Sequence, residues 1–392
     1  MRTLRSGVLS PRLLSARTLL LAALLASAVF AGIYAAVTGL EPHRIWALAA
    51  VFGYAGALLA APLPWRAPAA VLLALGTLLV PLGIELATGV ANPEIAILRD
   101  AAARWLETGT PFPHPSGSGD PNSFNVYLPG LALFGLPSAL FGGGPATDPR
   151  LYLGLAAVLL FGLLRNRRLV FALLCCPFVA LQLVTGATDV PVLGCLCLGL
   201  VLAGRDRFAA AGLLIGFAAA MKAFAWPAVI VLLVLACARG GVRAGLRAVV
   251  AVLIPPLVLL VPVIIADPHA FVVNAIELPL GGLDVRLTAG SPLPGQLLAS
   301  LVPGGSAIAG GLLALAALVL GVLLLRRPPR DAVHAARWLA LGLLLAVLLA
   351  PSSRYGYLVY PVGLLLLPYL AVPIEKLDTS PWARLGDRGE RG

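Results

Sequence analysis

Charged residues are scarce in this chain of 392 residues: they make up 11% of it, whereas 60% of it is hydrophobic. A soluble domain carries roughly 25% charged residues, so this composition excludes an ordinary soluble protein. Lysine is almost absent, since Lys222 and Lys376 are the only two, and arginine supplies nearly all of the basic residues. With the excess of Ala, Leu and Gly, this usage is typical of a GC-rich bacterial genome.

Patterns of metal ligands and nucleophiles are also missing. The five cysteines lie within apolar runs without metal-type spacing, which favours small buried side chains over a site. The four histidines are far apart, and His114 lies in a Pro/Gly/Ser-rich loop typical of a solvated side chain. No phosphate-binding glycine loop or nucleophile elbow is present. The sequence therefore predicts no metal site and no organic cofactor, and it gives no indication of a bound divalent cation.

Long apolar runs are what the chain has in abundance. Most are long enough to cross a bilayer core of roughly 30 Å, and helices are the only plausible spanning elements here. The sequence predicts an all-α polytopic membrane protein, a single integral membrane domain over 1–392 with an uncleaved first span. About twelve spans are expected near residues 18–38, 44–62, 68–89, 149–164, 169–186, 188–204, 208–222, 224–238, 246–265, 304–325, 333–350 and 355–372.

The segment 127–143 is short and broken by Pro and Gly, so it fits either a further span or a re-entrant or surface-lying helix pair. The arginines decide between these, because basic residues concentrate in cytoplasmic loops. If 127–143 does not cross and the N-terminus is cytoplasmic, most of the 28 basic residues fall inside. We therefore expect a multi-pass protein of the bacterial plasma membrane, with both termini and the tail 373–392 cytoplasmic. The net charge of +11 then reflects these loops and predicts no nucleic-acid partner.

Residues 92–127 form the one long polar interval between apolar runs. Asn92 suits an N-cap, Pro93 the first helical position and Glu94 the first turn, and Gly109 suits the end of a helix. Within that helix an apolar stripe recurs at helical spacing: Ile95, Leu98, Ala102, Trp105 and Leu106. The pattern predicts an amphipathic helix on a bilayer surface. The alternative is a solvated linker whose helix has no functional role.

Other polar features fall on the same predicted outer side. Lys222 lies among apolar residues with no acid nearby in sequence, so it either contacts an anion such as a phosphate or extends to the headgroups. Asp189 either joins neighbouring hydroxyls in binding sugar hydroxyls or a cation, or it caps a span. Arg354 either grips a phosphate or anchors the last span, whose tyrosines fit an interfacial belt.

Two further regions belong to this predicted outer side. The loop 266–303 is long enough to be functional, and Arg286 is one of its charges. Glu85 lies near the outer end of its span and is expected to line the same cavity. Asp100 follows Glu94 by less than two turns and is expected to pair with Arg104.

Several motifs resemble those of the GT-C superfamily of membrane glycosyltransferases, in particular the bacterial family 87 enzymes that use polyprenyl-phosphate mannose. The similar features are an acid just after an early span, a helix ending AAARWLETGTPF, the start Tyr127-Leu128-Pro129, and GLLIGFAAAMKAF with its Lys222. The family's first-loop acid is usually Asp, and Glu94 stands there in this chain. The family's Gly-Gln-x-Asn is replaced by 186–189, GATD, and Gly130 replaces a proline.

The resemblance implies an inverting enzyme whose extracytoplasmic first loop, 90–143, holds a general base. That base would be Glu94, with Asp100 as the rival, and it would activate a hydroxyl of a lipid or glycan acceptor. The polyprenyl-phosphate sugar donor would enter from the membrane lipids, and the expected substrate-binding residues are Lys222, Arg354, Asp189, Tyr127 and Arg286. Two alternatives stay open: a polytopic transporter or lipid flippase, and a catalytically inactive membrane scaffold.

Overall fold

The computed structural model describes residues 16–61, 66–114, 123–279 and 290–371, and within them it shows helices and no strand. The chain forms two compact units, Met1–Ile84 and Glu85–Gly392. The first contains α1 (Ala16–Val37), α2 (Glu41–Ala60), α3 (Arg66–Ala74), the π-helical turn η1 (Leu75–Leu79) and the beginning of α4 (Val80–Thr88).

The first unit is held together by small residues and one tryptophan. Gly53 of α2 lies so close to Gly76 of η1 that a Cβ on Gly53 would come within 2.8 Å of the Gly76 Cα. Trp46 is fully buried and donates from Nε1 to the backbone oxygen of Thr77, 3.0 Å away. That backbone oxygen lies in the π-helical turn, where the regular helical bonding is interrupted.

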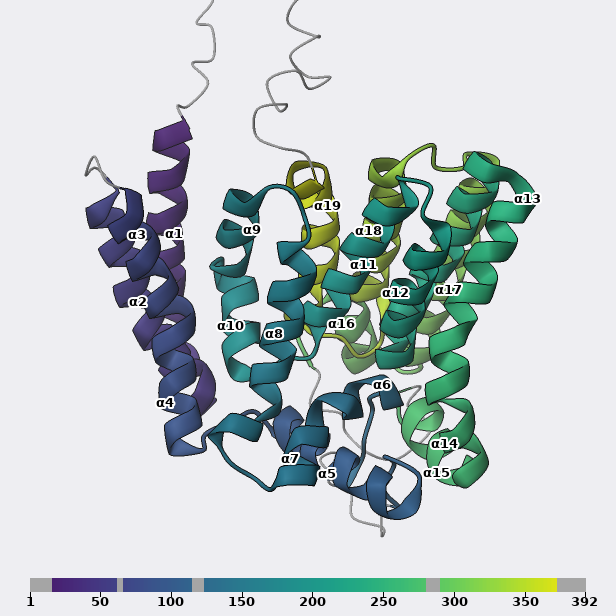
Figure 1. The fold of residues 1–392 in the computed structure, drawn as a ribbon, viewed down its shortest axis with the longest axis horizontal. Helices are drawn as coiled ribbons and strands as arrows, with labels where there is room; N and C mark the ends of the chain where they lie inside the picture. Colours follow the sequence, from purple (N-terminus) through teal and green to yellow (C-terminus); the bar gives the residue numbers. More distant parts are fainter. Residues whose placement is uncertain (1–15, 62–65, 115–122, 280–289, 372–392) are drawn as a thin grey trace, which may run out of the picture. The chain divides into compact units, whose positions relative to one another are not determined.

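The second unit begins with helices that are short or broken (Figure 1). They are α5 (Pro93–Thr108), α6 (Pro129–Ala132), η3 (Leu133–Gly135), α7 (Leu136–Phe141), η4 (Pro145–Thr147), α8 (Pro149–Gly162), α9 (Arg167–Leu174), α10 (Pro177–Thr185), α11 (Asp189–Ala203) and α12 (Phe208–Met221). They continue with η5 (Ala223–Ala225), α13 (Trp226–Leu259), α14 (Val261–Ala266), α15 (Pro268–Phe271), η6 (Val272–Glu277), α16 (Pro294–Leu301), α17 (Gly305–Arg326), α18 (Ala332–Leu349), η7 (Tyr355–Leu358) and α19 (Val359–Ala371).

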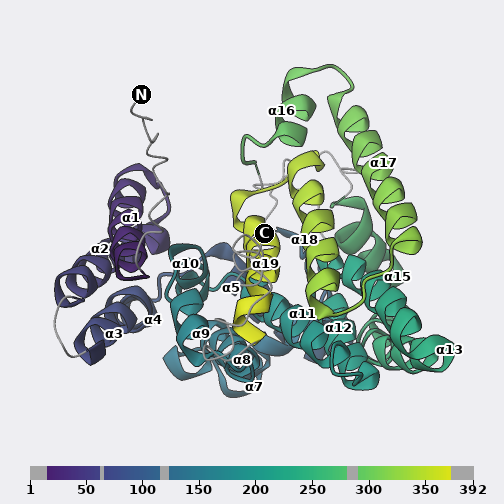
Figure 2. The ribbon, with the colours of Figure 1, turned by 90° about the horizontal axis from the view of Figure 1, so that it is seen from above.

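Helix α11 is the centre of the second unit. Nearly all of its residues are buried, because α8, α12, α18 and α19 pack around it, and Figure 2 shows it among these neighbours. Close approach again depends on glycine: Gly194 faces Leu160 of α8, and Gly199 faces Ile215 of α12. The ends of this buried helix therefore fix the positions of whatever polar groups they carry.

Helix α13 reverses direction at Gly241, whose φ of 67° and ψ of −168° are not helical. Gly212 of α12 packs on Ala248, and Gly216 packs on Val252, so the second half of α13 runs parallel to α12. The first half follows α12 through η5 and returns beside it. The first half corresponds to the predicted span 224–238, and the second half together with α14 corresponds to 246–265.

The predicted outer-face segment 127–143 is not one continuous helix. It breaks into α6, η3 and α7, which pack on α5 near one end of the unit (Figure 1). The close contact is again at glycines: a Cβ on Gly135 would lie 2.1 Å from the Leu98 oxygen, and one on Gly130 would lie 2.8 Å from the Ala220 oxygen.

Among the residues that the structure describes, six helical runs are long and apolar enough to cross a membrane: Arg17–Val37, Glu41–Ala60, Ala67–Thr88, Ala223–Ala266, Gly305–Arg326 and Ala332–Leu349. Helices α9 and α10, predicted as one span over 169–186, meet the same criterion together but are bent by 65°. The predicted all-helical, multi-pass architecture is confirmed at this level. The number of spans, about twelve, stays a prediction.

The contact between α12 and α13 makes the first testable prediction. A Cβ on Gly216 would lie 2.2 Å from the Val252 oxygen, so Gly216→Ala must push the two helices apart. We expect a loss of roughly 1–3 kcal/mol in the free energy of unfolding, measured by thermal unfolding in detergent. The matched control is Gly310→Ala in α17, where no described atom lies within 4 Å of the added carbon. Equal midpoints for the two variants would contradict the close contact.

Candidate functional site

Glu94 lies in the first turn of α5, near the beginning of the second unit. The helix begins at Pro93 and ends before Gly109, whose φ of 79° is left-handed, as the sequence predicts. Asn92 lies at the N-cap position, but its side chain does not cap the helix. The stripe points inward at Ile95, Leu98 and Ala102, which are buried, whereas Leu106 is exposed. The helix thus presents its first turn, with Glu94, to the rest of the unit.

Glu94 forms an ion pair with Arg354, which lies just before η7 and far away in sequence. The Arg354 Nη1 atom donates to Glu94 Oε1 at 2.8 Å. Glu94 is mostly buried, with 15% of its side chain exposed, while Arg354 is more open at 40%. Burial alone disfavours the charged guanidinium, but Tyr357, Glu94 and Tyr127 outweigh it and raise the pKa of Arg354 above its usual range. Arg354 is therefore a permanent cation beside a carboxylate.

A second ion pair joins the ends of α11 and α12. Lys222 Nζ lies 2.5 Å from Asp189 Oδ1, and the Tyr360 hydroxyl donates to the same oxygen at 2.7 Å. Asp189 and Lys222 are both buried, and Tyr360 is fully buried. The capping interpretation of Asp189 is wrong, because Thr188 is at the cap position and the Asp189 side chain pairs with Lys222. Extension of Lys222 to the headgroups is likewise wrong, since its ammonium faces an acid.

Aromatic rings connect the two ion pairs. Lys222 Nζ lies 5.4 Å from the centre of the Tyr127 ring and 5.7 Å from that of Tyr357. Arg354 Cζ lies 5.4 Å from the same Tyr357 ring, so both cations contact one aromatic surface. The Phe224 ring packs on the rings of Tyr357 and Tyr360. We call Glu94, Arg354, Asp189, Lys222, Tyr127, Tyr357 and Tyr360 the paired-charge cluster.

Tyr127 is fixed in this cluster by its backbone. Its N–H donates to the Asn125 side chain at 3.0 Å, and the Asn125 N–H donates in turn to Asn274 Oδ1 at 2.9 Å. The next residue, Leu128, donates to the Met221 oxygen directly before Lys222. Burial, and then the nearby charge of Glu94, raise the pKa of Tyr127 well above its usual value. At neutral pH it is a neutral phenol between two charge pairs.

Several polar atoms around the cluster have no hydrogen-bond partner among the described residues. They are Arg354 Nε, Gln182 Oε1, Thr188 Oγ1 and Ser353 Oγ, all buried. The Gln182 amide is anchored at its other end, since Nε2 donates to the Gly356 oxygen at 3.0 Å. A buried polar atom without a partner costs roughly 1–3 kcal/mol, so these atoms are suited to a polar ligand or water.

Of the seven residues predicted as base or substrate-binding, the structure brings together five: Glu94, Lys222, Arg354, Asp189 and Tyr127. Arg286 lies outside the described residues. Asp100, the rival base, is exposed, and within the described ranges it forms no ion pair with Arg104. These findings concern only where the residues lie, and their roles as base or substrate-binding groups stay predictions.

Sequence reasoning missed two tyrosines. Tyr357 and Tyr360 were predicted as part of an interfacial belt, yet both point into the cluster, and only Tyr355 is exposed. The close spacing of three tyrosines after an arginine is the signal, but an aromatic belt has the same composition. Nor is His114 merely solvated, because its Nε2 lies 2.6 Å from Asp267 Oδ2.

A separate buried network surrounds Arg150, which the sequence did not single out. Its guanidinium donates twice to Asp148, at 2.9 Å each, and also to Glu85 and the Val90 oxygen. Arg150 is 1% exposed and Glu85 is fully buried. Burial opposes ionisation of Asp148, but bonds from Arg150 and the charge of Arg99 outweigh it and lower its pKa. Glu85 belongs to this network, so its predicted place in the same cavity as Glu94 is wrong.

The network positions the helix that carries Glu94. Arg99, five residues after Glu94 on α5, pairs with Asp148, and the Val90 oxygen precedes the start of α5. The Arg150 side chain also packs on Gly186, whose left-handed backbone, with φ of 83°, leaves room for it and for Ile95. Helix α5 is thus held by Arg354 at its first turn and by Asp148 at Arg99.

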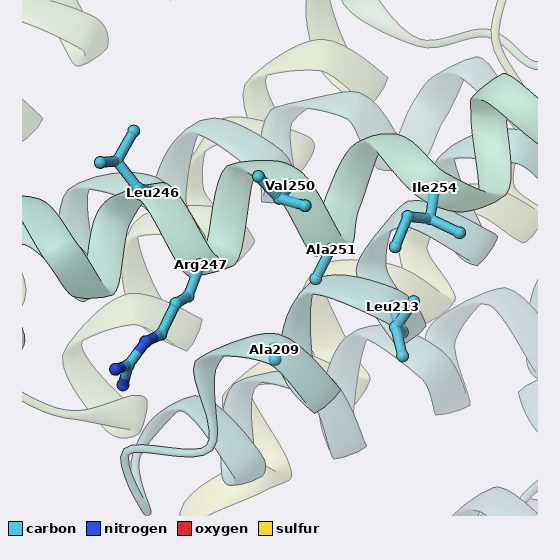
Figure 3. A pocket seen from close by; sticks show the side chains of 7 residues that line it. All are labelled: Ala209, Leu213, Leu246, Arg247, Val250, Ala251 and Ile254. Carbon is cyan, nitrogen blue, oxygen red and sulfur yellow. The ribbon is translucent and has the colours of Figure 1, made fainter.

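Within the described ranges, no group of three His, Cys, Asp or Glu side chains is placed to hold a metal ion. A groove of about 440 Å³ lies between α12 and the second half of α13 (Figure 3), and none of its lining residues belongs to the paired-charge cluster. Comparison of the chain with models of protein families, with curated proteins and with solved structures gives no match.

The Arg150 network makes a stability prediction. Arg150→Met leaves Asp148 and Glu85 buried without their main partner, and breaking a buried pair in this way typically costs about 3–5 kcal/mol. We expect a large fall in the thermal midpoint in detergent. The control, Arg239→Met, removes an exposed pair with Asp206 and should change the midpoint little. A stable Arg150→Met variant would show that the network does not hold the fold.

Proposed function

We propose that this protein is a membrane glycosyltransferase that moves a sugar, by its resemblance mannose, from a polyprenyl-phosphate donor to a hydroxyl of a lipid or glycan acceptor. The observation that carries this proposal is the gathering of Glu94, Arg354 and Lys222 in one cluster. The family resemblance implies the base role of Glu94, and a phosphate contact is one of the two interpretations of Lys222 and of Arg354. The three residues come from α5, η7 and the end of α12, far apart in the chain.

The cations would hold the phosphate of the donor. Arg354 offers a fork of donors, of which Nη1 contacts Glu94 and Nε has no described partner. Lys222 adds a second positive charge near the same Tyr357 ring. These charges stabilise the negative charge that grows on the phosphate oxygen as the bond to the sugar breaks. Asp189 and Tyr360 would keep Lys222 in place.

Glu94 would act as the general base. It takes the proton of the acceptor hydroxyl while that oxygen bonds to the anomeric carbon of the sugar. The bond between that carbon and the phosphate oxygen breaks with its electron pair, and polyprenyl phosphate leaves. Attack from the face opposite the leaving group inverts the configuration. The products are the glycosylated acceptor, polyprenyl phosphate and a proton on Glu94.

The resting ion pair implies an exchange of partners. Arg354 cannot give its full fork to a phosphate while Nη1 is bound to Glu94. A donor phosphate would take Arg354 and release the Glu94 carboxylate toward the acceptor. The unpartnered oxygens of Thr188, Gln182 and Ser353 would suit hydroxyl groups of the sugar or acceptor. Donor binding would thus precede activation of the base.

The membrane arrangement is part of the proposal. Twelve spans result if both halves of α13, the bent pair α9 and α10, and the shorter apolar helices α8, α11, α12 and α19 all cross. Both termini would then be cytoplasmic, with 90–143 and 266–303 on the outer face of the plasma membrane. A transporter or flippase would place its polar groups near the bilayer midplane. Charge pairs at helix ends, as at Asp189 and Lys222, favour the transferase.

The base assignment predicts the effect of two isosteric changes on α5. Glu94→Gln removes the proton acceptor and should lower sugar transfer by about 10²–10⁴-fold. Asp100→Asn changes an exposed acid on the same helix and should leave transfer intact. The measurement is transfer of labelled mannose from polyprenyl-phosphate mannose to endogenous acceptors, in membranes from a deletion strain carrying each variant at equal expression. Full activity in Glu94→Gln would remove Glu94 from the base role.

The exchange of partners predicts opposite effects on donor binding at the two ends of one ion pair. Arg354→Gln removes a charge-assisted contact worth about 1.5–3 kcal/mol, so polyprenyl phosphate should bind about tenfold or more weakly. Glu94→Gln frees Arg354 and should bind polyprenyl phosphate at least as tightly as the unchanged protein. Equilibrium binding to purified protein in nanodiscs measures both. If both variants lose affinity equally, the pair is only structural.

A further inference from the structure

The groove between α12 and α13 is lined by seven residues, six of them apolar and the seventh Arg247 (Figure 3). It opens outward, because Leu213, Val250 and Ile254 on its rim are each exposed by 43% or more. Lys222 lies at the far end of α12, about 13 Å along the helix axis from Leu213. The groove is therefore separate from the paired-charge cluster, and what it binds does not depend on the proposed transferase activity.

Polarity changes along the length of the groove. Figure 3 shows the Arg247 guanidinium at one end and Ile254 at the other, and the side chains between them are aliphatic. Arg247 follows the chain reversal at Gly241 by less than two turns, so it lies near the end of the helical hairpin. An apolar groove with one cation at its end is complementary to an amphiphile that has an apolar chain and an anionic head.

The charge of Arg247 is not used within the described residues. Arg247 has no ion pair there, whereas nearby Arg239 pairs with Asp206 and also donates to the Arg330 oxygen. A guanidinium binds phosphate oxygens through two parallel donors. An unpaired arginine beside apolar surface that faces outward therefore complements a lipid phosphate in charge and in geometry.

We propose that this groove binds an anionic phospholipid. The phosphate lies on the Arg247 guanidinium, and one acyl chain follows Val250 and Ile254 on α13 and Leu213 on α12. The lipid covers the outward-facing side of the helix pair beside the close contact between Gly212 and Ala251. It thereby completes the packing of a helix pair whose contact surface consists largely of small residues.

The test is native mass spectrometry of the full chain in detergent, with phosphatidylglycerol or phosphatidylcholine added at equal concentration. We expect the unchanged protein to retain phosphatidylglycerol in preference to phosphatidylcholine. Arg247→Gln should reduce phosphatidylglycerol retention about fivefold, which corresponds to roughly 1 kcal/mol for one arginine near the headgroups. Ala209→Phe fills the groove from α12 and should reduce retention of both lipids.

The matched control is Arg243→Gln, which removes an exposed arginine one turn earlier that does not line the groove. It should retain phosphatidylglycerol as the unchanged protein does. Equal losses in Arg243→Gln and Arg247→Gln would reduce the effect to general surface charge and overturn the proposal. Equal retention of the two lipids by the unchanged protein would also overturn it. A dimer that forms without lipid and dissociates in Ala209→Phe would overturn it too, because a second copy of the chain would then occupy the groove.

Discussion

Burying charge in an apolar helical unit is costly, and the second unit meets this constraint by pairing its buried charges. An isolated ion in such an environment loses its hydration, and only a partner with good geometry compensates for that loss. Lys222 pairs with Asp189, which also accepts a hydrogen bond from Tyr360, and Arg150 pairs with Asp148 and Glu85. Because the contacts of Lys222 and Tyr360 with Asp189, and of Arg150 with Glu85, join segments that are distant in sequence, the requirement for pairing also fixes which helices are neighbours.

The two networks serve this requirement in different ways. The Arg150 network is sealed: its guanidinium is 1% exposed and bonded to two acids and a backbone oxygen. The pair of Arg354 and Glu94 is more open, and Arg354 keeps an unpartnered Nε among the described residues. A sealed network gives rigidity, whereas an open pair with spare donors can exchange its partner for a ligand. The Arg150 network therefore holds α5 in place, while the contact between Arg354 and Glu94 at the first turn of α5 can open for a ligand.

Much of the helical pattern and of the candidate site was readable from the sequence. Long apolar runs fixed the helices, and Pro93 and Gly109 marked the ends of α5, because these signals are local. Lys222 and Asp189 were recognisable as unusual polar residues, yet nothing local showed that they pair with each other. The inward orientation of Tyr360 and the burial of Arg150 depend on neighbours from distant helices, and so they required the fold.

The pair of Glu94 and Arg354 spans 260 positions of the chain. At roughly 5–20 residues per second, ribosomal synthesis leaves tens of seconds between the appearance of the first residue and that of the second. During that interval Arg354 is not yet available to Glu94, and the Tyr360 hydroxyl is not yet available to Asp189. The cluster is complete only when Arg354 and Tyr360 have been synthesised, so a chain that stops before them contains Glu94, Asp189 and Lys222 without the second cation and without the Tyr360 hydroxyl.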